Sequence, residues 1–308
     1  MIIVKLIGGL GNQMYQYAYG LQLAAEYKEA ICFDTSFYPK GEQPALYHLN
    51  VPHYPLWDTV GIERSEIARV KLEQKLYHVL QKTIRVLGRT DRTGNLLFHS
   101  YAKRGLLFNF DPYYYDVPRC DRKNKYIYGY FQGEQYFSQC IPLLRQQFTV
   151  SGPLGAQAQK YQEQIRNMNS VALHIRLGDY KNSANTDLDV CSVSYYRRGI
   201  QYVCDALQDP VLFVFTNDIQ AATNMLEFPE NTIFVQETKD YEDFALMSQC
   251  KHFVLSNSTF SWWAAYLAEN SEKIVTVPQK WRHSEKEEPA IYMPYMVKLP
   301  IDGEGTIK

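Results

Sequence analysis

The second half of the chain alternates short apolar runs with stretches of helical length, and this rhythm constrains the fold more than any other feature. Strands are predicted at 171–177, 211–216, 232–235, 252–256 and 274–277. The runs are rich in Val, Leu, Ile and Phe, as strands buried on both faces are. Strands alternating with helices pair in parallel, so the pattern predicts an α/β fold with a doubly wound parallel sheet.

The first half begins in the same way. An apolar β-branched run at 2–7 is followed by a glycine-rich turn and an amphipathic segment that extends to about Tyr27. A second strand ends at Asp34, and another is predicted at 126–132. The breaker-rich segment 151–155 is the best candidate linker. Since the chain has 308 residues and a domain has roughly 150, we predict two domains, 1–150 and 151–308.

The strand at 171–177 carries polar side chains where it ends. Side chains alternate across a strand, so His174 and Arg176 share one face and the apolar residues between them share the other. Ligands of open α/β sheets bind beyond the carboxyl ends of the strands, where the guanidinium of Arg176 suits a phosphate. Taken alone, this strand supports a structural ion pair between Arg176 and Asp179 as well as it supports phosphate binding. After the strand at 211–216, Asp218 either caps the next helix, which is favoured, or contacts a ligand.

The segment 256–267 begins with a cluster of hydroxyls. Ser258, Thr259 and Ser261 lie where a helix is predicted to start, and helix N-termini bind anions through their N–H groups and their positive dipole end. An ordinary serine or threonine N-cap is the alternative. We favour phosphate binding for the hydroxyls and a core position for the two tryptophans that follow.

The glycine turn resembles a dinucleotide-binding fingerprint. Gly9 and Gly11 follow a strand, and Asp34 ends the next one, as a ribose-binding carboxylate would. The third glycine of the fingerprint is missing, because Met14 stands there. An oxidoreductase that uses NAD is therefore an alternative with weaker support.

Composition excludes several classes of protein. The net charge is −1, from 32 basic and 33 acidic residues, so no global field attracts nucleic acid. The six cysteines show no metal-ligand spacing and are expected to be reduced thiols of a cytoplasmic protein. No run of about 18 apolar residues predicts a membrane span. The 25 tyrosines suit sugar stacking, which keeps a non-catalytic carbohydrate-binding protein as a third hypothesis.

Residues 63–88 form a basic segment with helical spacing. The segment is expected either to lie on an anionic bilayer or to present a solvated helix face, and the second is favoured. Its apolar positions are Ile67, Val70, Val79, Leu80, Ile84 and Leu87, interspersed with Lys71, Lys75, Lys82 and Arg85.

Taken together, these segments resemble the inverting α1,2-fucosyltransferase family, which uses GDP-fucose. The resemblance covers nearly the whole chain and departs from the family pattern at Leu177, where a second arginine is common, and at Tyr15, where phenylalanine is. Four motifs carry it in the family's order: 8–18 (GGLGNQMYQYA), 129–137 (GYFQGEQYF), 174–180 (HIRLGDY), and 243–248 (DFALMS) leading into 256–267.

The resemblance implies a GT-B fold of two Rossmann-like domains facing a cleft, with an acceptor-side domain at 1–150 and a GDP-fucose-binding domain at 151–308. It implies that Arg176 holds the β-phosphate, that Ser258 and Thr259 contact the diphosphate, and that Asn12 meets the donor from the other domain. The donor-binding residues it implies are Asn12, His174, Arg176, Asp218, Asp243, Asn257, Ser258 and Thr259.

The expected reaction transfers fucose to the 2-hydroxyl of a terminal β-galactoside without a metal or other cofactor, because the arginine and the helix N-terminus replace the metal. Inversion by a single displacement needs a base near the acceptor hydroxyl. Asp179 is the candidate, with Asp34, Asp187 and Asp189 left open. The expected partners are GDP-fucose, a galactoside glycan and the inner membrane face, which the protein would contact peripherally from the cytoplasm.

Overall fold

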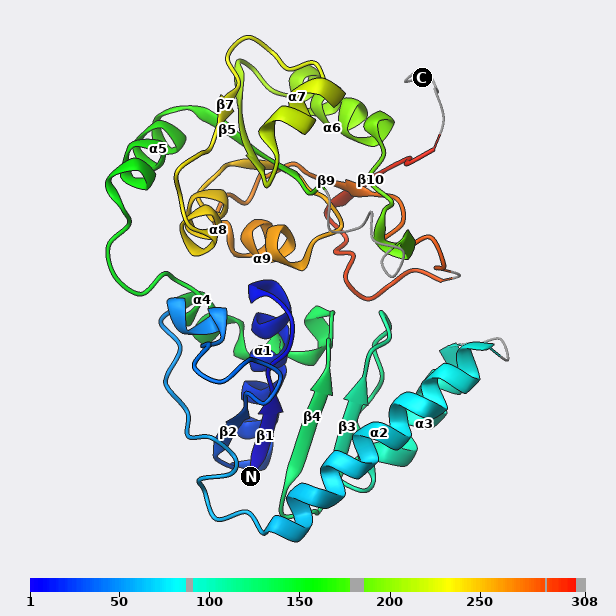
Figure 1. The fold of residues 1–308 in the computed structure, drawn as a ribbon. Helices are drawn as coiled ribbons and strands as arrows, with labels where there is room; N and C mark the ends of the chain where they lie inside the picture. Colours follow the sequence, from blue (N-terminus) through cyan, green and yellow to red (C-terminus); the bar gives the residue numbers. More distant parts are fainter. Residues whose placement is uncertain (87–90, 178–185, 286, 303–308) are drawn as a thin grey trace. The chain divides into compact units, whose positions relative to one another are not determined.

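The computed structural model describes residues 1–86, 91–177, 186–285 and 287–302, and it divides into two compact units, Met1–Phe148 and Thr149–Lys308. Each unit is an α/β structure built on a parallel sheet (Figure 1). The α/β class with parallel strands is therefore confirmed. The boundary at 148–149 lies just before the predicted linker.

The first unit holds a four-stranded sheet in the order β2-β1-β4-β3, with every pair parallel. Its helix α1 packs closely on β1, because a Cβ at Gly20 would lie 2.4 Å from Val4 Cγ2. Gly20 is thus the glycine that lets the helix approach the strand closely. Met14, which stands where the fingerprint has its third glycine, is buried in the core. The elements are β1 Ile2–Lys5, α1 Leu10–Tyr27, β2 Ile31–Asp34, α2 Arg64–Val86, α3 Asp91–Ala102, β3 Leu106–Asn109, β4 Lys125–Gly129 and α4 Ile141–Gln147.

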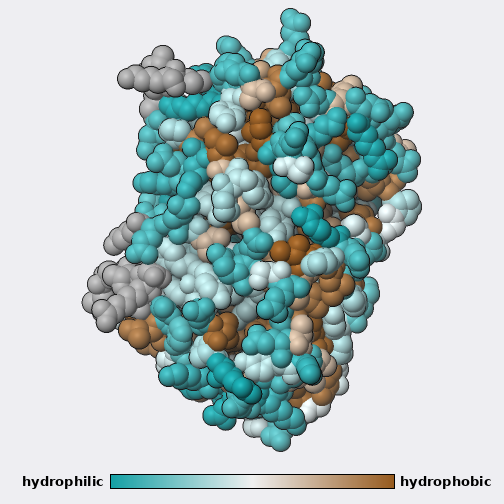
Figure 2. Space-filling view, turned by 180° about the vertical axis from the view of Figure 1, so that it is seen from behind, coloured by the Kyte–Doolittle hydropathy of each residue, from teal (hydrophilic) through white to brown (hydrophobic). Residues whose placement is uncertain are grey.

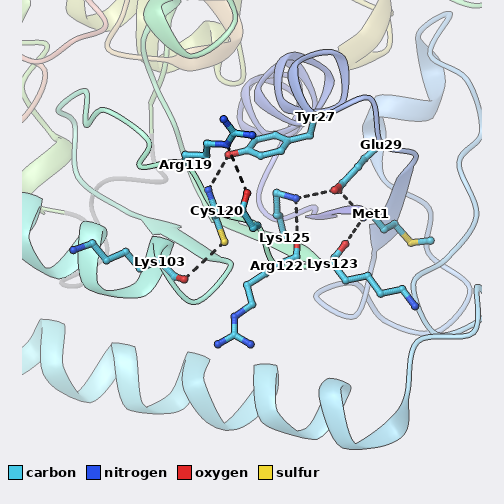
Figure 3. Close-up of polar contacts among 10 residues, drawn as sticks. Met1, Tyr27, Glu29, Lys103, Arg119, Cys120, Arg122, Lys123 and Lys125 are labelled. Carbon is cyan, nitrogen blue, oxygen red and sulfur yellow. Dashed lines mark hydrogen bonds and ion pairs between the residues drawn. The ribbon is translucent and has the colours of Figure 1, made fainter.

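The starts of β1 and β4 are tied together by charged groups (Figure 3). The Met1 amino group donates to Glu29 Oε2 and to the Lys123 carbonyl, both at 2.6 Å. Lys125 Nζ donates to Glu29 Oε1 at 2.8 Å and to the Arg122 carbonyl at 3.0 Å. The carboxylate of Glu29 thus pairs two cations at the amino edge of the sheet, which leaves the carboxyl edge for ligands.

The second unit holds a six-stranded sheet in the order β10-β9-β8-β5-β6-β7, again with every pair parallel. The strands include all five that the sequence predicted, with bounds that differ by up to two residues. The elements are α5 Ala156–Asn167, β5 Asn169–Ile175, α6 Val193–Ala206, β6 Pro210–Thr216, α7 Ile219–Met225, β7 Ile233–Phe234, α8 Asp240–Ser248, β8 His252–Val254, α9 Thr259–Leu267, β9 Val275–Pro278 and β10 Met296–Leu299.

The predicted alternation along β5 is confirmed. Val171, Leu173 and Ile175 belong to one hydrophobic cluster with residues of α6, and Leu177 packs against it. His174 lies between these positions and so faces the other side of the sheet. The strand thereby delivers its polar side chains to one side of its carboxyl end.

Candidate functional site

Successive strands are added to the second sheet first on one side of β5 and then on the other, so the strand order reverses between β5 and β8. From β5 the chain proceeds through β6 to β7 on one side, and β8 then pairs with β5 on the other side. The crevice beyond the carboxyl ends of two such strands is the usual ligand site of an open α/β sheet. Residues 174–177 end one strand and 256–259 follow the other, so the structure brings two predicted motifs to this point.

His174 and Ser256 join the two strand ends. His174 Nδ1 lies 2.8 Å from Ser256 Oγ, and the His174 ring packs 6.0 Å from the Phe260 ring at the start of α9. Burial, with the adjacent cation of Arg176, lowers the pKa of His174 to about 3. The imidazole is therefore neutral at physiological pH and holds the β8 side of the site through a hydrogen bond.

Ser258 occupies the N-cap position of α9 without capping the helix. Its side chain is 2% exposed and makes no cap hydrogen bond, and no residue in the described ranges pairs with its Oγ. By contrast, Ser192 at the N-cap of α6 accepts from the Tyr195 amide at 3.1 Å. A buried hydroxyl without a partner costs about 1–3 kcal/mol. Ser258 thus does not cap α9 through its side chain, and its hydroxyl lies at a helix N-terminus, a place where proteins often bind anions.

The predicted core position of the tryptophans is confirmed. Trp262 and Trp263 are fully buried, and Trp262 Nε1 donates to the Ile291 carbonyl at 2.7 Å. They anchor α9 so that its first residues, including Thr259, stay at the strand ends.

Asn217 fixes the segment that carries Arg176, and the sequence analysis assigned it no role. Its side chain accepts from the Leu177 amide at 2.9 Å and donates to the Leu177 carbonyl at 2.5 Å. The neighbouring Asp218 caps α7 by accepting from the Ala221 amide at 2.9 Å. The favoured capping role of Asp218 is therefore what the structure shows.

Asn257 joins two loops. Its Nδ2 donates to the Leu188 carbonyl at 2.7 Å and to the Trp281 carbonyl at 3.0 Å, and its Oδ1 accepts from the Cys191 thiol. The sequence predicted a donor contact for Asn257, whereas both of its amide hydrogens are committed to the protein. The side chain thus ties the loops at Leu188 and Trp281 to the segment before α9.

Asp243 lies on α8, which packs against the start of α9 through a contact of 5.6 Å between the Phe244 and Phe260 rings. The Asp243 carboxyl accepts from Thr238 Oγ1 at 2.5 Å. Burial, reinforced by Asp240 and Glu242, raises its pKa to about 6. The group is thus partly protonated near neutral pH and can both donate and accept hydrogen bonds.

The candidate bases that the structure describes are engaged in contacts within the protein. Asp179 lies outside the described residues. Asp34 is buried and accepts the Tyr126 hydroxyl, with Lys5 Nζ 3.7 Å away, so its side chain serves the first sheet and not a ribose. The carboxylate of Asp187 accepts the amide and the hydroxyl of Ser284, both at 2.7 Å.

The first unit has a reversal of its own, between β1 and β4. Asn12, at the start of α1, accepts from Gln132 Nε2 at 3.2 Å, so the glycine turn and the segment after β4 are linked. Phe131 next to Gln132 has a φ of 51°, a conformation that costs a residue with a side chain of its type of order 1–3 kcal/mol. The contact between Gln132 and Asn12 could not be expected from single strands, because the two residues lie 120 positions apart.

Among the described residues, no cluster of histidine, cysteine and carboxylate side chains could hold a metal ion. The polar groups at the two strand ends are hydroxyls, an imidazole and a guanidinium. These are hydrogen-bond donors suited to an anion.

Comparisons with known proteins find glycosyltransferases. O-antigen biosynthesis glycosyltransferase WbnK of Escherichia coli is 28% identical over 291 residues, which cover 90% of this chain and 93% of that protein. Alpha-1,2-colitosyltransferase of Escherichia coli is 26% identical, covering 93% of this chain and 94% of that protein. Galactoside alpha-(1,2)-fucosyltransferase 1 of Leontocebus fuscicollis is 27% identical over 43% of this chain and 40% of its own.

Among solved structures, NodZ alpha-1,6-fucosyltransferase soaked with GDP-fucose superposes with a TM-score of 0.55 at 13% identity, covering 87% of this chain and 91% of that one. At that identity the likeness shows a shared fold. The model of glycosyl transferase family 11 matches residues 95–298. Because that match spans more than half of the 308 residues, the protein belongs to glycosyl transferase family 11.

Proposed function

We propose that this protein transfers L-fucose from GDP-β-L-fucose to the 2-hydroxyl of a terminal β-galactoside, with inversion and without a metal. Family membership supports glycosyl transfer. The names of the relatives support a 6-deoxysugar and an α1,2 linkage. The oxidoreductase alternative loses its main support, since Asp34 is engaged inside the first sheet.

The proposal includes the GT-B arrangement, in which two Rossmann-like domains face a cleft. Both units have a parallel sheet whose strand order reverses at one point, and NodZ shares the fold. The second unit would bind GDP-fucose and the first the acceptor. Asn12, held by Gln132, would approach the donor from the first unit.

The observation that carries the proposal is the buried, unpaired hydroxyl of Ser258 at the N-terminus of α9. It lies at the strand-order reversal, where the segment bearing Arg176 also ends. A diphosphate would accept hydrogen bonds from Ser258 and Thr259 and an ion pair from Arg176. His174 and Asp243 would lie toward the guanosine.

The chemistry follows from these donors. The acceptor 2-hydroxyl attacks C1 of fucose as the bond from C1 to the β-phosphate oxygen breaks, and the acceptor proton passes to a base, for which Asp179 is proposed. Negative charge grows on the β-phosphate as the sugar becomes cationic. Donors placed there in advance stabilise the transition state, and each is typically worth about 3–4 kcal/mol.

The test is release of GDP from GDP-fucose in EDTA, with and without a β-galactoside, followed by NMR assignment of the product linkage. We expect acceptor-dependent release and an α1,2 product. Arg176→Ala should lower kcat/KM by about two to three orders of magnitude. Arg197→Ala, an exposed arginine on α6, serves as the matched control and should retain activity.

The sugar is tested in the same assay. Colitose is the 3-deoxy form of L-fucose, so a site that hydrogen-bonds the 3-hydroxyl should reject GDP-colitose strongly. Faster turnover of GDP-colitose than of GDP-fucose would reassign the donor. Hydrolysis of neither, with binding of NADH or of glycan alone, would overturn the proposal.

A further inference from the structure

Helix α2 has two apolar faces, and only one of them packs against the protein. On the inner face Val70 and Tyr77 are each 1% exposed, and the Tyr77 hydroxyl donates to the Phe108 carbonyl at 3.0 Å. Gln74 Nε2 donates to the Tyr126 hydroxyl at 2.8 Å. These contacts fix the rotation of the helix about its own axis.

The outer face carries four large aliphatic side chains. Leu72, Leu76, Val79 and Leu80 are 58%, 48%, 64% and 43% exposed. Positions i, i+4, i+7 and i+8 share one stripe of an α-helix, so the four form a continuous apolar strip, called here the outer stripe. On α3, which follows α2 in the chain, Leu96 is also 66% exposed.

Isolated apolar residues on a surface need no explanation, and on the face drawn in Figure 2 hydrophobic residues lie among a majority of hydrophilic ones. The outer stripe differs, because its members adjoin one another along two turns of a single helix. Ordinary soluble helices place such a stripe against a core. A stripe opposite the core side therefore indicates a surface that something else covers.

A row of lysines borders the outer stripe. At about 100° per residue, Lys71, Lys75 and Lys82 lie within about 40° of one another on one side of it. All three are exposed, and within the described parts of the chain none of them is ion-paired. An apolar strip flanked by exposed cations matches the boundary between anionic headgroups and acyl chains.

We propose that the outer stripe and its lysine row dock the protein on an anionic lipid surface, with α2 lying in the plane of the interface. No helix in the described residues is long and apolar enough to cross a bilayer. A second copy of the chain is a poorer occupant, because α2 offers its lysine row no matching row of exposed carboxylates.

The test is flotation of the full-length protein with vesicles of phosphatidylcholine containing about 30% phosphatidylglycerol, compared with phosphatidylcholine alone. We expect binding to the anionic vesicles at about 50 mM NaCl and its loss at about 500 mM, where charges are screened. The triple variant Lys71→Gln/Lys75→Gln/Lys82→Gln should lower the partition coefficient by about 100-fold, since each lysine near an anionic surface contributes about fivefold.

Two variants test the apolar part. Leu72→Ser/Leu76→Ser/Val79→Ser should abolish flotation, and the single change Val79→Asp should weaken it if the triple variant folds poorly. Leu143→Ser is the matched control, because Leu143 is 41% exposed on α4, and it should float like the wild type. The variants should keep wild-type circular dichroism and wild-type transfer to a soluble galactoside, so docking is measured apart from catalysis.

Failure of the wild type to float at low salt would overturn the proposal, as would flotation unaffected by the stripe variants. Analytical ultracentrifugation tests the alternative that a second copy of the chain covers the outer stripe. A dimer that dissociates in the Val79→Asp variant, without lipid binding by the wild type, would assign the outer stripe to a second copy instead.

Discussion

His174 illustrates how a single side chain couples the site to pH. Its folded-state pKa of about 3 lies below the ordinary value of 6.5, because of burial and the neighbouring Arg176. The unfolded chain therefore binds more protons than the folded one between these values. Stability that is full above pH 6.5 must fall as the pH drops toward 3.

We predict that His174→Asn flattens this acid dependence. The asparagine retains a hydrogen-bond partner for Ser256 but does not titrate. The wild type should lose free energy of unfolding at up to about 1.4 kcal/mol per pH unit from this residue, and the variant should lose correspondingly less. Urea unfolding from pH 7 to pH 4 measures it. Equal slopes for the two proteins would show that His174 does not titrate as described.

Ser258 and Ser261 form a matched pair of buried serines in the same turn. Ser261 Oγ donates to the Ser258 carbonyl at 3.2 Å, whereas no described residue pairs with Ser258 Oγ. We predict that Ser258→Ala weakens GDP binding about tenfold without destabilising the protein, because it removes a donor that only the ligand uses. Ser261→Ala should cost about 1 kcal/mol of stability and leave GDP affinity unchanged. Calorimetric titration with GDP measures the affinity of each variant. A loss of GDP affinity in Ser261→Ala but not in Ser258→Ala would refute the ligand role of Ser258.

At this scale strand alternation predicted the face of β5 on which His174 lies, and the packing of Val171, Leu173 and Ile175 in one cluster confirms it. The sequence could not predict the partners of Asn217 or Gln132, because their hydrogen bonds join segments 40 and 120 positions apart. The hydrogen bonds of Asn257 to the Leu188 and Trp281 carbonyls could not be predicted either, because both carbonyls are distant in the sequence.

Among the elements, most strands were predictable from the sequence, including short ones such as β2, β8 and β9. The strands β5 and β6 have seven residues each and lie between other strands of the sheet, in the order β8-β5-β6-β7. The strands β3 and β10 have only four residues and were missed. Four residues do not establish a period, and pairing with β4 and β9 stabilises them instead.

Helix α2 is the element whose faces the sequence did not resolve. The apolar positions expected between 63 and 88 divide between the two faces: Val70 is buried, whereas Val79 and Leu80 are exposed. Leu87 lies outside the described residues. Periodicity alone cannot distinguish a helix with two apolar faces from one with a broad core face.

Variants of Asn217 and Asp218 test whether the hydrogen bonds at the end of β5 are needed for activity. We predict that Asn217→Ala lowers kcat/KM about tenfold or more, because the segment with Arg176 loses both hydrogen bonds at Leu177. Asp218→Ala removes a helix cap and should cost about 1 kcal/mol of stability while kcat/KM stays within about twofold. Steady-state kinetics beside thermal unfolding give both numbers. If the aspartate variant lost more activity than the asparagine variant, Asp218 would be a donor ligand, as the family resemblance implies.

At the scale of the whole molecule, the two units share one architecture. Each has a parallel sheet and a strand-order reversal with polar side chains at the carboxyl edge. The second unit supplies cationic and neutral donors, and no metal-binding cluster exists in the residues described. A diphosphate leaving group needs charge stabilisation from somewhere, and here Arg176 and α9 would provide it.

We therefore predict that transfer persists in excess EDTA and that added magnesium changes kcat by less than about twofold. Initial rates of GDP release before and after chelation provide the measurement. Loss of activity that magnesium or manganese restores would mean that a metal, and not α9, neutralises the diphosphate.

The most direct test is hydrogen exchange of the full-length protein with and without GDP. The peptide spanning residues 256–263, at the start of α9, should gain protection when GDP binds, because its amides and the Ser258 hydroxyl are proposed to meet the diphosphate. The peptide spanning 219–225 in α7 should exchange unchanged. If calorimetry showed that GDP binds while the peptide at 256–263 exchanged as in the free protein, the nucleotide site would lie elsewhere and the account would be contradicted.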